Sequence, residues 1–222
     1  MTDDRGSLAG RRVVVGVAGS IAAYKAVSLV RLLAERGAVV DVAMTPAATQ
    51  FVTPLTFASL THRRVVDDVM ALDADSQIAH VELAEGADAI VIAPATANLL
   101  AELAAGNAGN AVTAIALASR APLVVAPAMD AGMWTHPATQ RNVETLRAFG
   151  HRIVEPEVGA LASGLTGVGR LAEPETIVEA VERLFARAGD LEGLQVVVSA
   201  GGTREPIACG GRASSIRGNL LA

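Results

Sequence analysis

One loop of the sequence sets an acidic side chain among large apolar ones, directly after a strand-like segment. That segment is APLVVAP, residues 121–127, and it continues as AMDAGMW, in which Asp130 follows one methionine and precedes another methionine and Trp134. Ligands of open parallel α/β sheets bind outside the carboxyl ends of the strands. Asp130 is therefore a candidate for contacting a substrate.

A glycine turn in GVAGSIAAYKA, residues 16–26, leads from a strand-like run into a helical one. Free amides at a helix N-terminus bind phosphate well, and a plain tight turn is the alternative. Gly16 and Gly19 are three residues apart and Ile21 follows, so the dinucleotide pattern GxGxxG is absent. The turn at Gly19 and Ser20 therefore favours one phosphate, as in a mononucleotide.

Two more strand ends carry hydroxyl and amide side chains. In MTPAATQF, residues 44–51, Thr45 precedes a proline that opens a helix. Its hydroxyl can cap that helix or bind a phosphate, and capping is the simpler interpretation. In APATANLL, residues 93–100, small side chains let a flat ligand approach the backbone, and Asn98 can cap the next helix or hydrogen-bond the edge of a ring.

Acid–base chemistry needs a titratable side chain, and the four histidines stand at positions 62, 80, 136 and 151. His80 lies shortly before a strand-like run, but a lone histidine is more often a surface or satisfied core residue. Neither an HExxH pattern nor a Ser-His-Asp order is present, and the single Cys209 excludes a disulfide framework and a cysteine-rich metal site. We predict no metal centre.

The stretch GALASGLTGVGR, residues 159–170, is rich in glycine and precedes a helical segment. Glycine gives the backbone conformational freedom, so we expect a mobile loop. The loop is either a plain linker or a lid over a site, and Arg170 at its end can meet a carboxylate.

Short Val-, Ile- and Ala-rich runs alternate with longer segments of helical periodicity. This pattern predicts a Rossmann-like (flavodoxin-like) doubly wound parallel sheet between two helical layers. Ser20 is the expected N-cap of the first helix, and Gly37 its C-terminal stop. The predicted strands are 11–19, 38–45, 87–94, 121–127 and 151–156, and the predicted helices are 20–37, 97–105, 110–119, 137–149 and 174–187.

Composition limits the class of protein. The 222 residues are 51% hydrophobic and carry a net charge of −5, which suits one α/β domain with an ample core. No basic cluster stands out, so we expect no nucleic-acid partner. The N-terminus is polar and the apolar run after it is too short to span a membrane, so we expect a cytoplasmic protein.

A change of composition near residue 189 divides the chain. Residues 1–188 form the predicted α/β domain, and residues 189–222 form a tail that opens with LQVVVSAGGTREPI, residues 194–207. This opening reads as a strand with its own glycine turn, and the remainder shows no periodicity. With no partner for that strand, we expect the tail to be mostly flexible.

Five segments in order resemble one family, the homo-oligomeric flavin-containing cysteine decarboxylases, which act on phosphopantothenoylcysteine or on peptidyl cysteine. The resemblance covers residues 11–187. Each segment alone is a weak match, but five matches in the family's order make a strong resemblance. The segments look like the family's FMN turn, histidine motif, PASAN motif, PxMNxxMW motif and substrate lid. They are GSIAAYK (19–25), HVEL (80–83), PATAN (94–98), PAMDAGMW (127–134) and GLTGVGRLAEP (164–174).

The resemblance implies FMN held at a subunit interface of a homo-oligomer, either a trimer or a dodecamer. It also implies oxidative decarboxylation of a cysteine with a free carboxylate, with His80 as the catalytic base. The implied substrate-binding residues are Asp130, Met133, Ala162, Ser163 and Arg170. The implied cofactor-binding residues are Gly19, Ser20, Ile21, Thr45, Ala48, Phe51, Ala95, Thr96, Ala97, Asn98, Ala128 and Met129.

The sequence departs from this family in three places. Asp130 replaces the motif asparagine, and a carboxylate there repels the carboxylate of a substrate. Ser163 stands where the coenzyme A decarboxylases usually carry a cysteine, which returns the enethiol product to a saturated thiol. Residues 194–207 resemble the first strand of a phosphopantothenate–cysteine ligase domain, so we expect a truncated remnant of a fused ligase.

Three functions are compatible with the resemblance. Ser163, Asp130 and the ligase remnant favour a peptidyl-cysteine decarboxylase of ribosomal peptide natural-product biosynthesis, which stops at the enethiol while dioxygen reoxidises the flavin. The overall similarity of GSIAAYK, of GVGRLAEPETIV and of the ligase remnant itself favours phosphopantothenoylcysteine decarboxylase of coenzyme A biosynthesis. The third is a flavin-binding regulatory subunit without turnover, against which His80 argues, because a pure binder needs no base.

Overall fold

The computed structural model describes residues 6–70 and 78–186, which form a six-stranded parallel sheet and a separate antiparallel hairpin. The sheet order is β3-β2-β1-β4-β5-β6, so the chain reverses its direction across the sheet between β1 and β4. This order confirms the predicted Rossmann-like fold. The strands are β1 (Arg12–Val17), β2 (Val39–Met44), β3 (Val65–Val66), β4 (Ala89–Ala95), β5 (Leu123–Pro127) and β6 (Arg152–Ile153).

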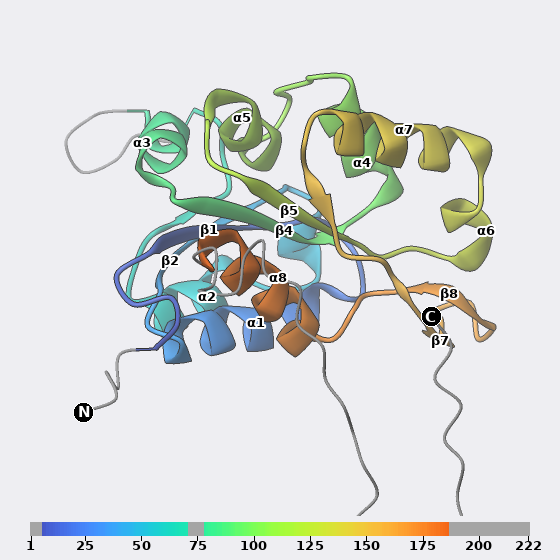
Figure 1. Cartoon of the computed structure of the whole chain (residues 1–222), viewed down its shortest axis with the longest axis horizontal. Helices are drawn as coiled ribbons and strands as arrows, with labels where there is room; N and C mark the ends of the chain where they lie inside the picture. The colour runs from blue at the N-terminus through green and yellow to red at the C-terminus, as the bar shows by residue number, and fades with distance from the viewer. Residues whose placement is uncertain (1–5, 71–77, 187–222) are drawn as a thin grey trace, which may run out of the picture. The chain divides into compact units, whose positions relative to one another are not determined.

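Helices cover both faces of the sheet (Figure 1). One face packs against α1 (Ala23–Glu35), α2 (Pro54–Thr61) and α8 (Pro174–Phe185). The other face packs against α3 (Ala79–Gly86), α4 (Ala97–Ala104), α5 (Ala111–Ala118) and α7 (Pro137–Ala148). The short helix α6 (Ala131–Trp134) follows β5 and contacts the hairpin of β7 (Glu157–Ala160) and β8 (Thr166–Arg170).

Alternate residues along the central strands fill two separate cores. In β1, Val13 and Val15 pack into the core beneath α1 and α8, whereas Val14 packs into the core beneath α3 and α5. Helices cover both faces of this parallel sheet, so both faces of its central strands are buried. These strands therefore appear in the sequence as nearly continuous apolar runs.

All predicted strands and helices occur, with ends shifted by a few residues. The prediction missed β3, α2, α3 and α6, which span between two and eight residues and show little periodicity. The glycine-rich stretch 159–169 was predicted to be a loop, but much of it pairs as β7 and β8. The predicted tail, 189–222, lies outside the described residues.

The first helix begins later than predicted. Its N-cap is Ala22, whereas the predicted cap, Ser20, accepts a hydrogen bond at 3.2 Å from the backbone N–H of Ala22 through its side-chain oxygen. Residues 19–22 therefore form a turn between β1 and α1. Gly37 ends the helix as predicted, at a φ of +87° that favours glycine.

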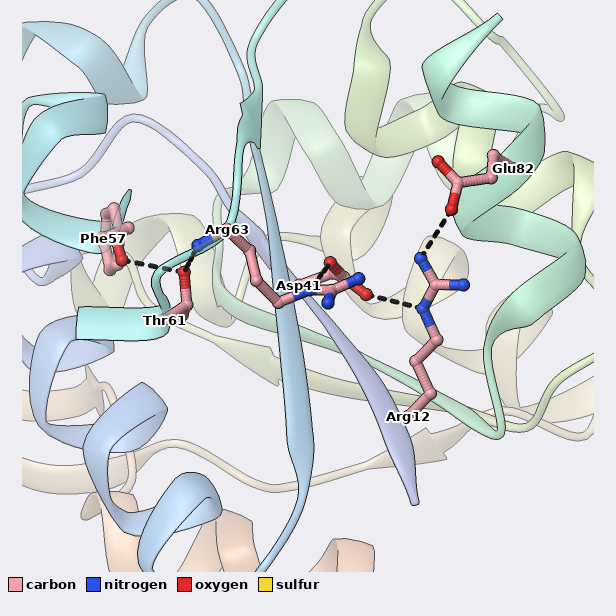
Figure 2. A network of polar contacts seen from close by, with 6 residues as sticks. All are labelled: Arg12, Asp41, Phe57, Thr61, Arg63 and Glu82. Atoms are coloured by element: carbon pink, nitrogen blue, oxygen red, sulfur yellow. Dashed lines mark hydrogen bonds and ion pairs between the residues drawn. The ribbon is translucent and has the colours of Figure 1, made fainter. Parts of the chain in front are cut away.

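A network of charged side chains lies where β1 and β2 face α3 (Figure 2). Asp41 of β2 is 2% exposed and accepts hydrogen bonds from Nε of Arg12 at 2.7 Å and from Nε of Arg63 at 2.5 Å. Arg12 also contacts Glu82 of α3 at 3.0 Å, and a Cβ at Gly86 would lie 2.3 Å from the Arg12 guanidinium. Arg12 thus links α3, at two places one turn apart, to the buried carboxylate in the sheet.

Candidate active site

A cavity of about 730 Å³ opens at the carboxyl ends of β1, β4 and β5. This is the side of the sheet, and the strand-order reversal, at which open α/β folds bind ligands. Its volume lies within the range of roughly 300–1,000 Å³ that is typical of cofactor sites. Its walls are the ends of these three strands, which are far apart in the sequence, together with the hairpin of β7 and β8.

The turn after β1 forms one wall, through Gly19, Ser20 and Ile21. A Cβ built at Gly19 would lie 2.4 Å from the Cβ of Ala47 and 2.7 Å from its carbonyl carbon, so a larger residue there forces the turn to move. The absence of a side chain at Gly19 therefore lets the turn pack closely against the loop after β2 while its other side faces the cavity.

Gly19→Ala should weaken FMN binding by about tenfold to a hundredfold, because overpacking costs roughly 1–3 kcal/mol and displaces the turn. Titration of the apoprotein with FMN, followed by flavin fluorescence, measures this change. Gly132→Ala is the matched control, since its Cβ would meet its nearest neighbour, Asp130 Oδ1, at an ordinary 3.8 Å. Equal FMN affinity in the two variants would contradict the role given to the turn.

The loop after β2 contributes less to the cavity than predicted. Thr45 is 7% exposed, and its hydroxyl accepts a hydrogen bond at 3.2 Å from the N–H of Ala48, which is fully buried. Neither residue lines the cavity, whereas the half-exposed Phe51 does. This bond closes a local turn ahead of the 3₁₀ helix Ala48–Gln50, whose N-cap is Ala47 without a side-chain cap, so the interpretation of Thr45 as a helix cap is not confirmed.

The loop after β4 brings Thr96 and Ala97 to the cavity but not their neighbours. Ala95 is fully buried in the core, and Asn98 is exposed and donates a hydrogen bond at 2.8 Å to Glu102 one turn along α4. The N-cap of α4 is Thr96, whose hydroxyl accepts from the N–H of Leu99 at 3.3 Å, so the suggestion that Asn98 caps this helix is wrong.

The loop after β5 brings Ala128, Met129, Asp130 and Met133 to the cavity. Trp134 is 8% exposed and packs into the core under α7, which anchors the loop. Two apolar side chains therefore face the cavity here, and the carboxylate between them is held at its rim.

Asp130 has two hydrogen-bond donors. Its Oδ1 accepts from the N–H of Gly132 at 3.1 Å, which caps α6, and its Oδ2 accepts from the hydroxyl of Ser163 at 2.6 Å. The hydrogen bond from Ser163, with the backbone bond from Gly132, lowers the pKa of Asp130 because both donors stabilise the carboxylate. Asp130 is therefore ionised at neutral pH.

The hairpin forms the remaining wall, through Ala160 to Ser163 and through Arg170. Arg170 forms an ion pair with Glu173 at the start of α8. Lys25 of α1, a cavity residue that the sequence analysis did not single out, donates to the same carboxylate at 3.1 Å and to the carbonyl of Leu171 at 3.3 Å. Its position within GSIAAYK was the available signal. These two cations can attract an anionic ligand group.

His80 does not line this cavity within the chain. It lies in the first turn of α3, and its Nδ1 is 2.9 Å from the carbonyl oxygen of Val69. In Figure 1, α3 covers the opposite end of the sheet from α6 and the hairpin. The cavity of one chain therefore contains the predicted binding surfaces without the predicted base.

The side chains of the described residues do not indicate a metal. Across residues 6–70 and 78–186, no three histidine, cysteine, aspartate or glutamate side chains gather closely enough to hold an ion. The same residues contain no helix long and apolar enough to cross a membrane. The cavity instead offers small side chains, turn amides and apolar walls, which fit a flat flavin ring with a phosphate tail.

Comparisons with known proteins agree with this geometry. The family model described as Flavoprotein matches residues 1–186. Over 201 residues, 90% of this chain, the sequence is 45% identical to the coenzyme A biosynthesis bifunctional protein CoaBC of Escherichia coli (strain K12). The chain spans about half the length of the curated relatives it matches, since that alignment covers 50% of the relative.

Two solved structures are also similar. A cysteine-to-serine mutant of PPC decarboxylase complexed with pantothenoylaminoethenethiol is 34% identical, with a TM-score of 0.70, over 79% of this chain and 98% of that one. The FMN-dependent cysteine decarboxylase SpaF is 35% identical, with a TM-score of 0.67, over 78% of this chain and 99% of that one. The chain therefore belongs to the Flavoprotein family, and decarboxylases that include an FMN-dependent one are among the solved structures it resembles.

Proposed function

We propose that this protein catalyses the FMN-dependent oxidative decarboxylation of a cysteine carboxylate to an enethiol. The observation that carries the proposal is the convergence of GSIAAYK, PATAN, PAMDAGMW and the hairpin on one cavity, although they are spread over residues 19–174. Similarity to FMN-dependent cysteine decarboxylases supports the same chemistry.

The reaction that this site would perform balances in two stages. The CH2–SH group loses two electrons and two protons in total, one hydrogen from the carbon and one from the sulfur, and becomes a thioaldehyde. The bond to the carboxylate then breaks, CO2 leaves, and the electron pair moves into the sulfur to give the enethiolate. FMN, when bound, supplies the two-electron oxidation.

Residues of this chain would hold the reactants and exclude water. The turn amides at Gly19 and Ser20 would bind the FMN phosphate, and Ala97 and Ala128 would leave room for the ring. Lys25 and Arg170 are positioned to receive an anionic group of the substrate. The hairpin would cover the site and limit the access of solvent.

The base requires a second copy of the chain. Because His80 lies on α3, away from the cavity of its own chain, we infer that His80 of a neighbouring copy completes each site in a homo-oligomer. This assignment agrees with the expected interface position of FMN, and a trimer or a dodecamer provides such interfaces. It also separates an enzyme from a regulatory flavin binder, which needs no base.

The comparisons change the order of the two substrate hypotheses. The sequence alone favoured a peptidyl cysteine, but the curated relatives are coenzyme A biosynthesis proteins at 45% identity, and a PPC decarboxylase is among the similar structures. We therefore propose phosphopantothenoylcysteine as the first candidate substrate. A C-terminal peptidyl cysteine is the second candidate, because the structure of the cysteine decarboxylase SpaF is nearly as similar and Ser163 replaces the lid cysteine.

Ser163 supports the enethiol as the product with either substrate. The PPC decarboxylase with a cysteine-to-serine substitution is complexed with an enethiol compound, as expected if serine does not return the enethiol to the saturated thiol. Without that return step the electrons stay on the cofactor, and dioxygen is the acceptor that would remove them.

Incubation of the FMN-loaded protein with phosphopantothenoylcysteine and with a peptide ending in cysteine, side by side, should give an enethiol product from the phosphopantothenoyl substrate. Mass spectrometry identifies it, because the enethiol has one pair of hydrogen atoms fewer than the saturated thiol. Turnover of the peptide alone would make the second candidate correct. A saturated thiol product would contradict the role of Ser163. If neither substrate released CO2, the proposed reaction would be wrong.

A further inference from the structure

Two residues that depart from the family motifs are in contact. The hydroxyl of Ser163, at the tip of the hairpin, donates to Oδ2 of Asp130 in the loop after β5, at 2.6 Å. We propose that Asp130 and Ser163 form a latch, a single functional unit that holds the hairpin tip over the cavity. The latch itself rests on this contact, and its effect on catalysis rests on the proposed function.

The base of the hairpin is fixed by its backbone. The N–H of Met129 donates to the carbonyl of Gly169 at 2.9 Å, and a Cβ at Gly169 would lie 2.1 Å from the carbonyl oxygen of Met129. A Cβ at Gly167 would lie 2.8 Å from that of Ala131. Strand β8 therefore runs against the strand-end loop at a distance that only glycine allows, and this end of the hairpin has little freedom to move.

The tip of the hairpin depends on side chains. Its turn closes on itself, with hydrogen bonds from Leu161 N–H to the carbonyl of Leu165 at 2.8 Å and from Gly164 N–H to the carbonyl of Leu161 at 3.0 Å. Residues 162–166 are exposed. Among the described residues, Ser163 and Asp130 provide a side-chain hydrogen bond between this tip and the loop after β5. Ala160 to Ser163 line the cavity, so this contact places a wall of the site.

The acceptor of the latch is rigid and charged. Gly132 N–H holds Oδ1 of Asp130 at the start of α6, which leaves Oδ2 directed at the hydroxyl of Ser163. A hydrogen bond to an ionised acceptor is stronger than one between neutral groups. Because these two donors also lower the pKa of Asp130, the carboxylate keeps its charge throughout the neutral range.

Pairing explains why an acid at position 130 is accompanied by a residue other than cysteine at position 163. A thiol at position 163 would be a weak donor to Asp130, and the carboxylate would disfavour its thiolate form. An amide at position 130 would still satisfy Ser163, since its oxygen can accept from Gly132 while its nitrogen donates to the hydroxyl. A functional cysteine at 163 therefore requires a neutral residue at 130.

Hydrogen–deuterium exchange of the FMN-loaded protein tests the latch without substrate. Ser163→Ala should accelerate the exchange of the amides of residues 161–166 about tenfold or more, as expected for the loss of a hydrogen bond to a charged group. Asp130→Asn should produce a smaller acceleration, because the amide keeps a bond to Ser163. Thr166→Val, an exposed position on the same hairpin, is the control and should change exchange little.

Non-additivity decides whether the two residues act as one unit. Asp130→Ala and the double variant Asp130→Ala/Ser163→Ala should show the same exchange at the tip, because the second substitution removes nothing further. Independent, additive effects, or an acceleration no larger than that of Thr166→Val, would overturn the latch.

The coupling also has a chemical readout. In a Cys209→Ser background, the thiol introduced by Ser163→Cys should titrate above the ordinary cysteine pKa of about 8.5, and adding Asp130→Asn should lower that pKa. Iodoacetamide reactivity as a function of pH measures both values. Equal pKa values in the two variants would contradict the pairing, whatever the substrate of the enzyme.

If the proposed reaction is correct, Ser163→Ala should also raise the KM for phosphopantothenoylcysteine more than it lowers kcat, because an open tip binds substrate less well. An accelerated exchange with an unchanged KM would retain the latch and remove its role in catalysis. If the amides of residues 161–166 exchange as slowly in Ser163→Ala as in the unmodified protein and turnover is normal, the latch is wrong and the proposed function is unaffected.

Discussion

His80→Asn should lower the rate of CO2 release by about 10²–10⁴-fold, the usual contribution of a general base, while FMN stays bound. Asparagine has a similar size and can keep the hydrogen bond to the carbonyl of Val69, but it cannot accept and release a proton at neutral pH. Cofactor binding should be unaffected because the cavity that would hold FMN is lined by other residues, and His80 is given a role in proton transfer alone. Stopped-flow flavin spectra and CO2 release measure the two properties.

His62→Asn is the matched control. His62 is exposed and ends α2 with a φ of +55°, a left-handed conformation that asparagine also adopts. This variant should turn over normally. Unchanged CO2 release in His80→Asn would remove His80 from the mechanism.

Mixed oligomers test whether His80 acts on a neighbouring copy. At an FMN concentration that loads His80→Asn chains, which retain an intact cavity, but not Gly19→Ala chains, which retain His80, co-expression of the two should restore activity that neither variant shows alone under the same conditions. Failure of the mixture to exceed the two parents would contradict a base shared between copies.

Asp41→Ala should lower the free energy of unfolding by about 3–5 kcal/mol, the cost of removing one partner from a buried charged network. The Asp41 side chain is 3% exposed and accepts from both Arg12 and Arg63, so its loss leaves two guanidinium groups facing each other over the sheet. Helix α3 loses its support as well, since Arg12 also contacts Glu82. Urea unfolding of the protein, followed by circular dichroism, measures the change.

Glu179→Ala is the control for this effect. Glu179 pairs with Arg183 on the exposed side of α8 at 2.9 Å, and such surface pairs contribute about 0.2–1 kcal/mol. A loss in Asp41→Ala no greater than in this variant would show that the network in Figure 2 does not support the fold.

Local patterns were sufficient to predict most of the sheet. Strands such as β1 and β4 are apolar on both faces, and helices such as α1 and α8 are long enough to show periodicity, so neither depends on distant partners to be recognised. The general position of the site also followed from the sequence, because ligands of this fold meet the strand ends.

Individual site residues were harder to predict, because the direction of a side chain depends on what packs around it. Thr96 and Asn98 are both polar and two residues apart, but Thr96 faces the cavity while Asn98 turns along α4 to Glu102. The hydroxyl of Thr45 hydrogen-bonds within a local turn and does not line the cavity. Lys25 reaches the cavity because Glu173 and Leu171, far along the chain, accept hydrogen bonds from its ammonium group.

The sequence by itself determined the fold class, the flavin family and the two unusual residues, Asp130 and Ser163, since these depend on composition, periodicity and motif order. The tertiary structure decided that the two residues are partners. They are separated in the chain by α6, α7, β6 and one strand of the hairpin, and only the packing of Gly167 and Gly169 against the loop after β5 brings them within hydrogen-bonding distance. A contact of this kind depends on close backbone packing between distant segments, which no local pattern contains.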